Sequence, residues 1–225
     1  MKVLETILHE IENVKVIDAT IDYKQYIPLN LSITNEDLKN LKLDSATDFE
    51  NYIENYLAKH NAKVAYGGYF EIRNLYKRSS IFNDSSVDER NIHIGLDLWI
   101  AAGTPVLAAV DGIIHSFNNN IGVGDYGPTI ILEHIIDKLK FYTLYGHLAV
   151  NSIAEIKVGT VVTKGQQIAT LGDASVNGDY APHLHFQIIR ELQNSSGDYP
   201  GVCSSKDQEY YLQNCPDPNI LLKIK

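Results

Sequence analysis

The chain has 225 residues, of which 44% are hydrophobic and 21% charged, so it has the composition of a globular protein with one sizeable core. Its 28 acidic and 19 basic residues give a net charge of −9, which argues against nucleic acid as a partner because that binding relies on Lys and Arg at phosphates. No stretch approaches the roughly 18 apolar residues of a membrane span, so no membrane partner is expected.

The N-terminal region, residues 1–63, is charged and predicts helices rather than strands. Met1–Glu10 interrupts its apolar residues with acids, as an amphipathic helix does, and never builds the apolar core of a signal peptide. We therefore expect a cytoplasmic location, or a periplasmic or extracellular one if a leader has been removed.

Two further helices are expected in this region. Asn35–Leu38 opens a short one, and Thr47–Glu50 matches a capping box, in which the first and last side chains each satisfy a free backbone N–H. One helix face then carries apolar and aromatic residues: Phe49, Tyr52, Ile53, Tyr56 and Leu57. The region holds no cluster that would do chemistry, so we expect a helical accessory region that packs against the rest.

Beyond residue 63 the pattern changes to short β-type runs between glycines. The strand candidates are Pro105–Val110, Gly112–Ile114, Thr129–Leu132, Phe141–Tyr145 and Gln167–Leu171. Asp111-Gly112 and Lys164-Gly165 supply turn residues that tolerate positive φ. This pattern predicts a mainly β chain, α+β overall, built on an antiparallel sheet rather than βαβ units. Residues 64–225 would form one domain with a loop-rich C-terminal tail.

Two cysteines, Cys203 and Cys215, lie in that tail. They are too few for a disulfide scaffold and do not form a CxxC metal motif. A bond between them would close a loop in an oxidising compartment, but without an export signal two free thiols are favoured.

Histidines gather in three places of the β region. In Ile92–Leu98, period-2 alternation puts His93, Gly95 and Asp97 on one face of a strand and the apolar residues on the other. Gly95 removes a side chain where a metal ion or substrate would approach. His183 and His185 share one face in the same way, and His147 ends a strand-like run.

These residue types suit a catalytic zinc site. Two histidines and one carboxylate, with an open fourth position, form a familiar set, and the four histidines with Asp97 cover three ligands and two further roles. The cation polarises a carbonyl and lowers the pKa of its water, while other imidazoles move protons. Either cluster alone is more often a hydrogen-bonded structural feature, but together they favour a shared partner because unpaired buried polar groups are costly.

Six segments follow one another between residues 91 and 188: His93-x-x-x-Asp97, Gly103-Thr104-Pro105-Val106-x-Ala108, Asp111-Gly112, Tyr145-Gly146-His147-Leu148, Val158–Gln166 and Pro182-His183-Leu184-His185-Phe186. Together they resemble the lysostaphin/LytM-type zinc metalloendopeptidases, a peptidoglycan DD-metalloendopeptidase-like family whose members commonly cut the peptide crosslinks or stems of peptidoglycan. The resemblance implies an antiparallel β catalytic domain with a groove over one sheet.

The resemblance also implies the roles of the polar residues. His93, Asp97 and His185 would be the Zn²⁺ ligands, and His147 and His183 the catalytic pair that activates water and stabilises the tetrahedral intermediate. The expected substrate is a peptide or peptidoglycan fragment, often with glycine or D-alanine, cut by metal-activated water. The loops Gly122–Thr129 and Gly172–Ala181 depart from the family pattern, so the scissile bond is not carried over.

Two other functions stay open beside the zinc endopeptidase. One is a catalytically silent binding or scaffold module on the same fold. The other is a biotin- or lipoate-carrying domain, since Val158–Gln166 resembles such a turn, although Lys164 lacks the flanking residues of a carrier motif. The remaining histidines, His9, His60, His115 and His134, are expected to be structural, His134 at a strand end. The sequence leaves the oligomeric state open.

Overall fold

The computed structural model describes residues 3–39, 45–73 and 89–225, and this part of the chain is mainly β, as predicted. Its large sheet contains eight strands, and every neighbouring pair is antiparallel except β1 and β2. From edge to edge the order is β1 (Tyr26–Pro28), β2 (Val64–Gly67), β4 (Leu96–Trp99), β11 (His183–Ile189), β8 (Leu139–Gly146), β7 (Gly127–Ile136), β6 (Gly112–Asn120) and β9 (Val161–Val162).

Two small sheets and several short helices complete the described chain. The sheets pair β10 (Gln167–Thr170) with β5 (Pro105–Leu107) and β12 (Val202–Ser204) with β3 (Arg90–His93). The helices are α1 (Leu4–Glu10), α2 (Glu36–Lys39), α3 (Ala46–Lys59), α4 (Gln208–Asn214) and α5 (Asn219–Leu222), with 3-10 turns η1 (Tyr23–Gln25) and η4 (Val150–Ile153). Across the described ranges, no helix has the length and apolar character needed to cross a bilayer.

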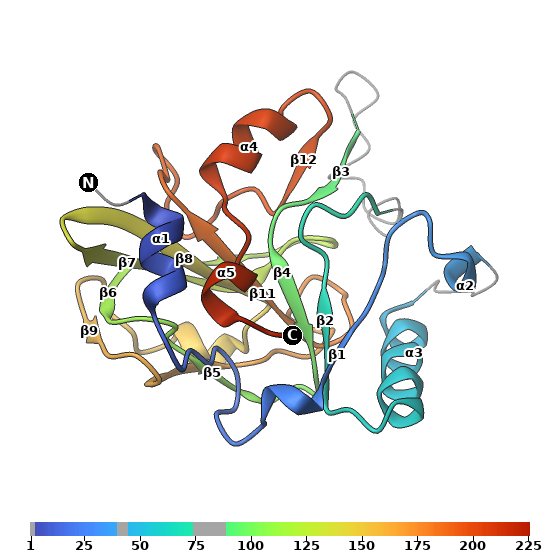
Figure 1. Ribbon diagram of the computed structural model, residues 1–225. Coiled ribbons are helices and arrows are strands. Elements are labelled where there is room, and N and C mark those ends of the chain that lie inside the picture. The colour runs from blue at the N-terminus through green and yellow to red at the C-terminus, as the bar shows by residue number, and fades with distance from the viewer. Residues whose placement is uncertain (1–2, 40–44, 74–88) are drawn as a thin grey trace.

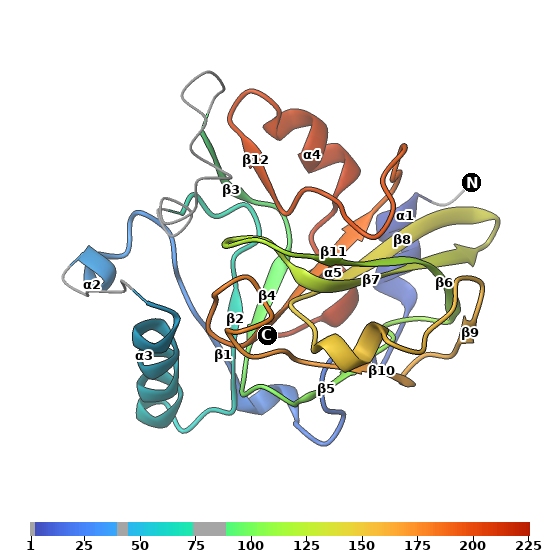
Figure 2. The same ribbon diagram turned by 180° about the vertical axis from the view of Figure 1, so that it is seen from behind.

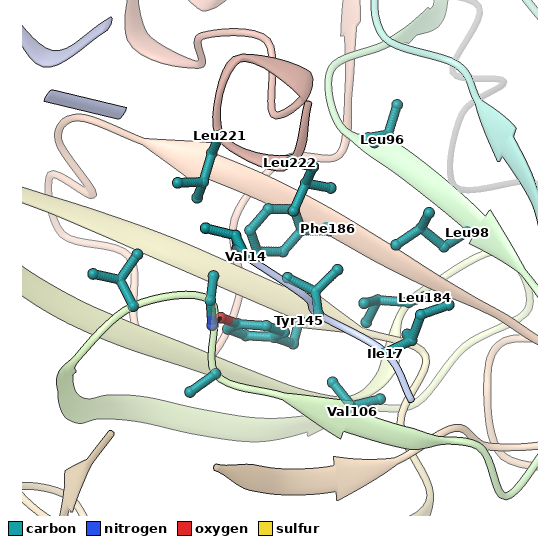
Figure 3. Packing of buried hydrophobic residues seen from close by; sticks show 14 of the residues in the cluster. Val14, Ile17, Leu96, Leu98, Val106, Tyr145, Leu184, Phe186, Leu221 and Leu222 are labelled. Carbon is teal, nitrogen blue, oxygen red and sulfur yellow. Dashed lines mark hydrogen bonds between the residues drawn. The ribbon is translucent and has the colours of Figure 1, made fainter. Parts of the chain in front are cut away.

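The main core lies between one face of the large sheet and the two ends of the chain. Helices α1 and α5 lie together over this face, while α3 lies beside β1 and β2 at one end of the sheet (Figures 1 and 2). Figure 3 shows Leu221 and Leu222 of α5 and Val14 of the N-terminal segment close to Phe186 and Tyr145 of the sheet. The N-terminal region thus shares a core with the strands, and the division into residues 1–63 and 64–225 stays a prediction.

Helix α3 carries the expected apolar face but begins at a different residue. Its N-cap is Ser45, whose hydroxyl accepts from the Asp48 backbone N–H while the Asp48 carboxylate accepts from the Ser45 N–H. The capping box predicted at Thr47–Glu50 is therefore wrong. Ser45 and Asp48 form the same reciprocal pair of hydrogen bonds two residues earlier. The buried residues Phe49 and Ile53 pack toward Trp99 of β4.

Three strand details differ from prediction. The run predicted as one strand over Ile92–Leu98 is two, since β3 ends at His93 and pairs with β12 while β4 starts at Leu96 in the large sheet. The Ile94 N–H donates to the Gly201 carbonyl, which turns the chain from one sheet to the other. Strand β5 stops at Leu107, and Gly112 does not have positive φ. Gly112 is needed because a Cβ there would overlap the Glu133 carbonyl.

His134 lies inside β7 rather than at a strand end, and its role is structural. The ring is fully buried, its Nδ1–H donates to the Asp111 carbonyl at 2.8 Å, and its Nε2 is 2.7 Å from the Thr143 hydroxyl. Burial lowers the pKa of His134 to about 4, so the folded protein holds this imidazole neutral.

We expect His134 to make the free energy of unfolding decrease as the pH falls. Its folded-state pKa lies below the unfolded value of 6.5, so its contribution is complete above about pH 6.5 and is lost as the pH falls toward 4. In a His134→Gln variant, the free energy of unfolding should fall less steeply with decreasing pH. The slope should be smaller by up to about 1.4 kcal/mol per pH unit, which corresponds to one proton. Urea unfolding from about pH 7 to about pH 4.5 measures this slope, and equal slopes for the two proteins would contradict it.

Candidate metal centre

Three adjacent strands of the large sheet bring the predicted residues to one place. In the β4–β11 register, Asp97 lies opposite His185 and Trp99 lies opposite His183. On the other side of β11, His185 lies opposite Gly146, so His147 follows directly after β8 ends. His93 comes from the end of β3, just before the chain turns into β4. The structure therefore brings together all five polar residues singled out in the sequence.

The ligand-type atoms of His93, Asp97 and His185 face one another in the interior. His93 Nε2 lies 3.2 Å from Asp97 Oδ1 and 2.9 Å from His185 Nδ1, and His185 Nδ1 is 3.3 Å from the same oxygen. These three buried side chains form a group that could hold a metal ion. Ligands about 2.1 Å from a tetrahedral zinc ion lie about 3.4 Å apart, so the separations are close to those that a metal ion requires.

The hydrogen bond of His93 to the backbone leaves its Nε2 atom, which faces Asp97 and His185, without a proton. Its Nδ1 is 2.8 Å from the carbonyl oxygen of Gly68, and a carbonyl oxygen only accepts hydrogen bonds. Nδ1 therefore carries the proton of the neutral ring, and Nε2 presents a lone pair to Asp97 and His185.

His185 is held in the complementary way. Its Nε2 lies 3.0 Å from Gln187 Oε1 and 3.3 Å from the Tyr126 hydroxyl. The Gln187 amide nitrogen donates to the Pro200 carbonyl and to Cys215 Sγ, which fixes its oxygen toward the ring. With Nε2–H donating, His185 Nδ1 is a second bare lone pair. Two imidazole lone pairs and a carboxylate oxygen at these distances repel one another unless a cation lies between them.

Burial and local charges keep His93 and Asp97 unprotonated near neutral pH. Burial, together with the nearby Arg73 guanidinium, lowers the pKa of His93 to about 4. Burial opposes ionisation of Asp97, but His93 and Arg73 still hold the pKa of its carboxyl well below the usual value. Neutral imidazole and ionised carboxylate are the forms that bind a metal ion.

Gly95 makes room for the ring of His185. A Cβ atom at this position would overlap His185 Cε1 and Nε2, so the close approach predicted at Gly95 is that of a ligand-type side chain rather than of the metal ion itself. We expect Gly95→Ala to displace this ring and to weaken metal binding by about 10- to 100-fold, the usual cost of disturbing a ligand's support.

Isothermal titration with zinc measures this loss. Gly103→Ala is the control, because its φ of +81° adds backbone strain while nothing lies within 4 Å of the new methyl group. That variant should lose some stability and keep its metal affinity. Equal affinities for the two variants would mean that the His185 position does not matter for metal binding.

His147 and His183 lie beside this group with their rings 4.2 Å apart, measured between centroids. Each is buried and has its Nδ1 2.8 Å from a carbonyl oxygen, of Asn177 for His147 and of Ala181 for His183. Both Nδ1 atoms therefore donate, which leaves each Nε2 as a proton acceptor. Burial lowers the pKa of His183 to about 4, and burial with the neighbouring His183 and His185 lowers the pKa of His147 well below its usual value.

The loop that departs from the family pattern supports both rings. Asn177 is fully buried, and its side chain donates to the Tyr180 and Gly172 carbonyls and accepts from the Tyr180 N–H. These hydrogen bonds within the loop help to fix the carbonyl oxygens of Asn177 and Ala181, which orient His147 and His183. His147 itself has a φ of +63°, a conformation that non-glycine residues rarely adopt and that concentrates at functional sites.

A cavity of about 220 Å³ opens onto these residues. Aromatic side chains form much of its wall, with Tyr126 in ring contact with His147 and His185, and Tyr180 edge-on to His147 and His183. The charged residues Arg90, Asp125 and Asp198 also line the cavity. A short segment of extended chain could reach the inner imidazoles through this opening.

Sequence reasoning missed four residues that support the site: Arg73, Trp99, Tyr126 and Gln187. Gln187 follows His185 by two residues on the same strand face, so the alternation that found the histidines could have found it. Trp99 stacks on His183 with 3.9 Å between ring centroids and meets Phe49 of α3 edge-on. Arg73 pairs with Asp97, but no periodicity or motif around it in the sequence indicates this role.

Comparisons with known proteins point to one family. Residues 91–197 match the family model described as peptidase family M23. A protein of Haemophilus influenzae named as an uncharacterized metalloprotease is 33% identical over 137 residues, 58% of this chain and 27% of that protein. The peptidoglycan DD-endopeptidase ShyC of Vibrio cholerae is 34% identical over 98 residues, 43% of this chain and 20% of that one.

Among solved structures, the catalytic domain of lysostaphin from Staphylococcus simulans is 30% identical with a TM-score of 0.37, and the match covers 54% of this chain and 80% of that one. The chain spans less than a third of the length of the curated relatives that it matches.

Proposed function

This chain belongs to peptidase family M23, and from that premise we propose that it is a zinc-dependent endopeptidase whose zinc is held by His93 Nε2, Asp97 Oδ1 and His185 Nδ1. The observation that carries the proposal is the meeting of two bare imidazole nitrogens with a carboxylate oxygen at 2.9 to 3.3 Å. Three protein ligands of this kind leave the fourth tetrahedral position for water or substrate, as catalytic zinc sites do.

Zinc held there supplies a Lewis acid for the scissile carbonyl and lowers the pKa of a water molecule toward neutrality. The protein's own contribution is proton transfer by His147 and His183. Each ring holds its proton on Nδ1 against a backbone carbonyl and is neutral at Nε2, so it can take a proton from the attacking water. The resulting imidazolium can donate from Nε2 to the developing oxyanion or to the leaving amine.

The proposed substrate is a peptide of the peptidoglycan type, with glycine or D-alanine near the cut. A relative named as a peptidoglycan DD-endopeptidase supports this class, and the aromatic walls formed by Tyr126 and Tyr180 favour small side chains next to the reacting amide. Nucleic acid is not proposed as a partner, given the net charge of −9.

Digestion of candidate peptides tests the function. Glycine-rich peptides and muropeptides are incubated with the full chain, with and without a chelator, and the products are read by mass spectrometry. We expect amide cleavage that stops with the chelator and returns with zinc. Cleavage that the chelator does not affect would overturn the role of the metal, and zinc at one per chain without any product would favour the silent scaffold.

The substrate bears on where the protein acts. Peptidoglycan lies outside the cytoplasmic membrane, which disagrees with the cytoplasmic location expected from the N-terminal residues. We propose action in the periplasm or outside the cell, with a peptidoglycan fragment in the cytoplasm as the alternative. Cell fractionation followed by detection of the chain in each fraction distinguishes the two.

For the domain organisation, we propose residues 64–225 as the catalytic domain and residues 1–63 as an accessory region attached through a shared core. The contact of Phe49 with Trp99 and of Trp99 with His183 supports a link between α3 and the proposed catalytic pair.

A further inference from the structure

The two oxygens of Asp97 have different surroundings. Oδ1 lies 3.2 Å from His93 Nε2 and 3.3 Å from His185 Nδ1. Oδ2 accepts a hydrogen bond from Arg73 Nη1 at 2.6 Å, and this ion pair is buried, with the two side chains 3% and 2% exposed. One oxygen therefore belongs to the candidate metal group, and the other is held by a guanidinium.

The Arg73 guanidinium is itself fixed by the segment that precedes it. Its Nε–H donates to Glu71 Oε2 at 2.8 Å, and the other Glu71 oxygen accepts from the Leu31 backbone N–H at 3.2 Å. The backbone is paired as well, since the Arg73 N–H donates to the Asn91 carbonyl and the His93 N–H donates to the Glu71 carbonyl. The guanidinium thus reaches Asp97 from an anchored position.

Gly68 shapes the same corner. Its carbonyl oxygen accepts from His93 Nδ1, and a Cβ there would overlap the Arg73 guanidinium and crowd the His93 ring. Its φ of +103° is a conformation that favours glycine. Residues 68–73 therefore support both His93 and Asp97, although they lie outside the stretch that matches the family model, residues 91–197.

We infer that Arg73 is a positioning residue that occupies Asp97 Oδ2 so that the carboxylate offers the metal ion only one oxygen. The inference rests on the proposed function. A carboxylate with both oxygens free can bind a cation through both of them, which would add a fifth donor that crowds the position that a catalytic site keeps for water or substrate. Bonding one oxygen to an anchored Arg73 prevents this.

Cobalt(II) in place of zinc tests the inference in the full chain. Four-coordinate cobalt has stronger visible absorption bands than five-coordinate cobalt, so the band intensity reports whether Asp97 binds through one oxygen or two. We expect a strong band in the unmodified protein. In Arg73→Met, which removes the guanidinium and keeps an apolar stem, we expect a band several-fold weaker at the same cobalt content per chain.

Two further variants make the comparison decisive. Arg73→Lys keeps a positive charge beside the buried Asp97 but cannot bond Glu71 and Asp97 with a planar fork, so we expect an intermediate band. Arg190→Met is the matched control, because Arg190 pairs with Glu5 away from the cavity, and its band should equal that of the unmodified protein.

The outcomes separate this inference from the proposed function. If the unmodified protein binds no cobalt, the proposed function fails and the inference fails with it. If it binds cobalt with a strong band and the folded Arg73→Met variant gives the same band, only the inference is overturned. If Arg73→Met does not fold, as judged by circular dichroism, Arg73→Lys decides, and a band equal to that of the unmodified protein overturns the inference.

Discussion

Replacing His147 by alanine is expected to leave one metal ion bound per chain and to lower kcat by about 10²- to 10⁴-fold. The reason is that His147 is not among the three side chains whose ligand-type atoms meet. Its ring lies 6.4 Å from that of His185 between centroids, and its Nδ1–H donates to the Asn177 carbonyl. Removing the ring takes away a proton acceptor without removing a ligand.

Metal content by mass spectrometry of the purified variant, and turnover of the cleaved peptide, measure the two effects separately. His147→Asn is the second variant, because asparagine tolerates the φ of +63° better than alanine and has no basic nitrogen near neutral pH. His115→Ala is the control, since it removes an imidazole from β6 outside the cavity wall. Full activity of a folded His147 variant would show that this residue does not act on protons.

Much of the site could be predicted because strand alternation is a local property. The shared face of His183 and His185 follows from their spacing of two residues on β11, and the antiparallel register then sets His185 against Asp97. The resemblance to lysostaphin-type metalloendopeptidases, drawn from these residues, is confirmed by the family match over residues 91–197. The mainly β fold, with an antiparallel arrangement of nearly all of its strands, is confirmed as well.

The unpredicted features depend on partners that are distant in the sequence. The break between β3 and β4 arises where the His185 ring covers Gly95 and where the Gly201 carbonyl takes the Ile94 N–H, and no local pattern reports these contacts. The ion pair between Arg73 and Asp97 joins two segments 24 residues apart and has no periodicity. Strand alternation finds side chains that share a face, but it cannot find what supports them from another segment.

Replacing Asp97 by asparagine is expected to abolish turnover by a different route, the loss of the metal ion. In the variant, the amide oxygen can accept from Arg73, as Oδ2 does now. The amide nitrogen then faces His93 Nε2 and His185 Nδ1, where it donates to their lone pairs instead of binding a cation. We expect zinc affinity to fall by more than about 100-fold, the upper end of the loss when only a ligand's supporting bond is removed.

The same geometry makes a second expectation for the metal-free proteins. Without zinc, the unmodified chain keeps two imidazole lone pairs and the Asp97 oxygen within 3.3 Å of one another, whereas the asparagine variant satisfies them with hydrogen bonds. Thermal unfolding should therefore give the metal-free variant a Tm at least equal to that of the metal-free unmodified chain. Zinc should raise the Tm of the unmodified chain but not that of the Asp97→Asn variant.

A variant that keeps the zinc affinity of the unmodified protein would show that Asp97 is not a ligand. Because His147→Asn should keep its zinc and Asp97→Asn should not, the pair separates proton transfer from metal binding within the same cavity.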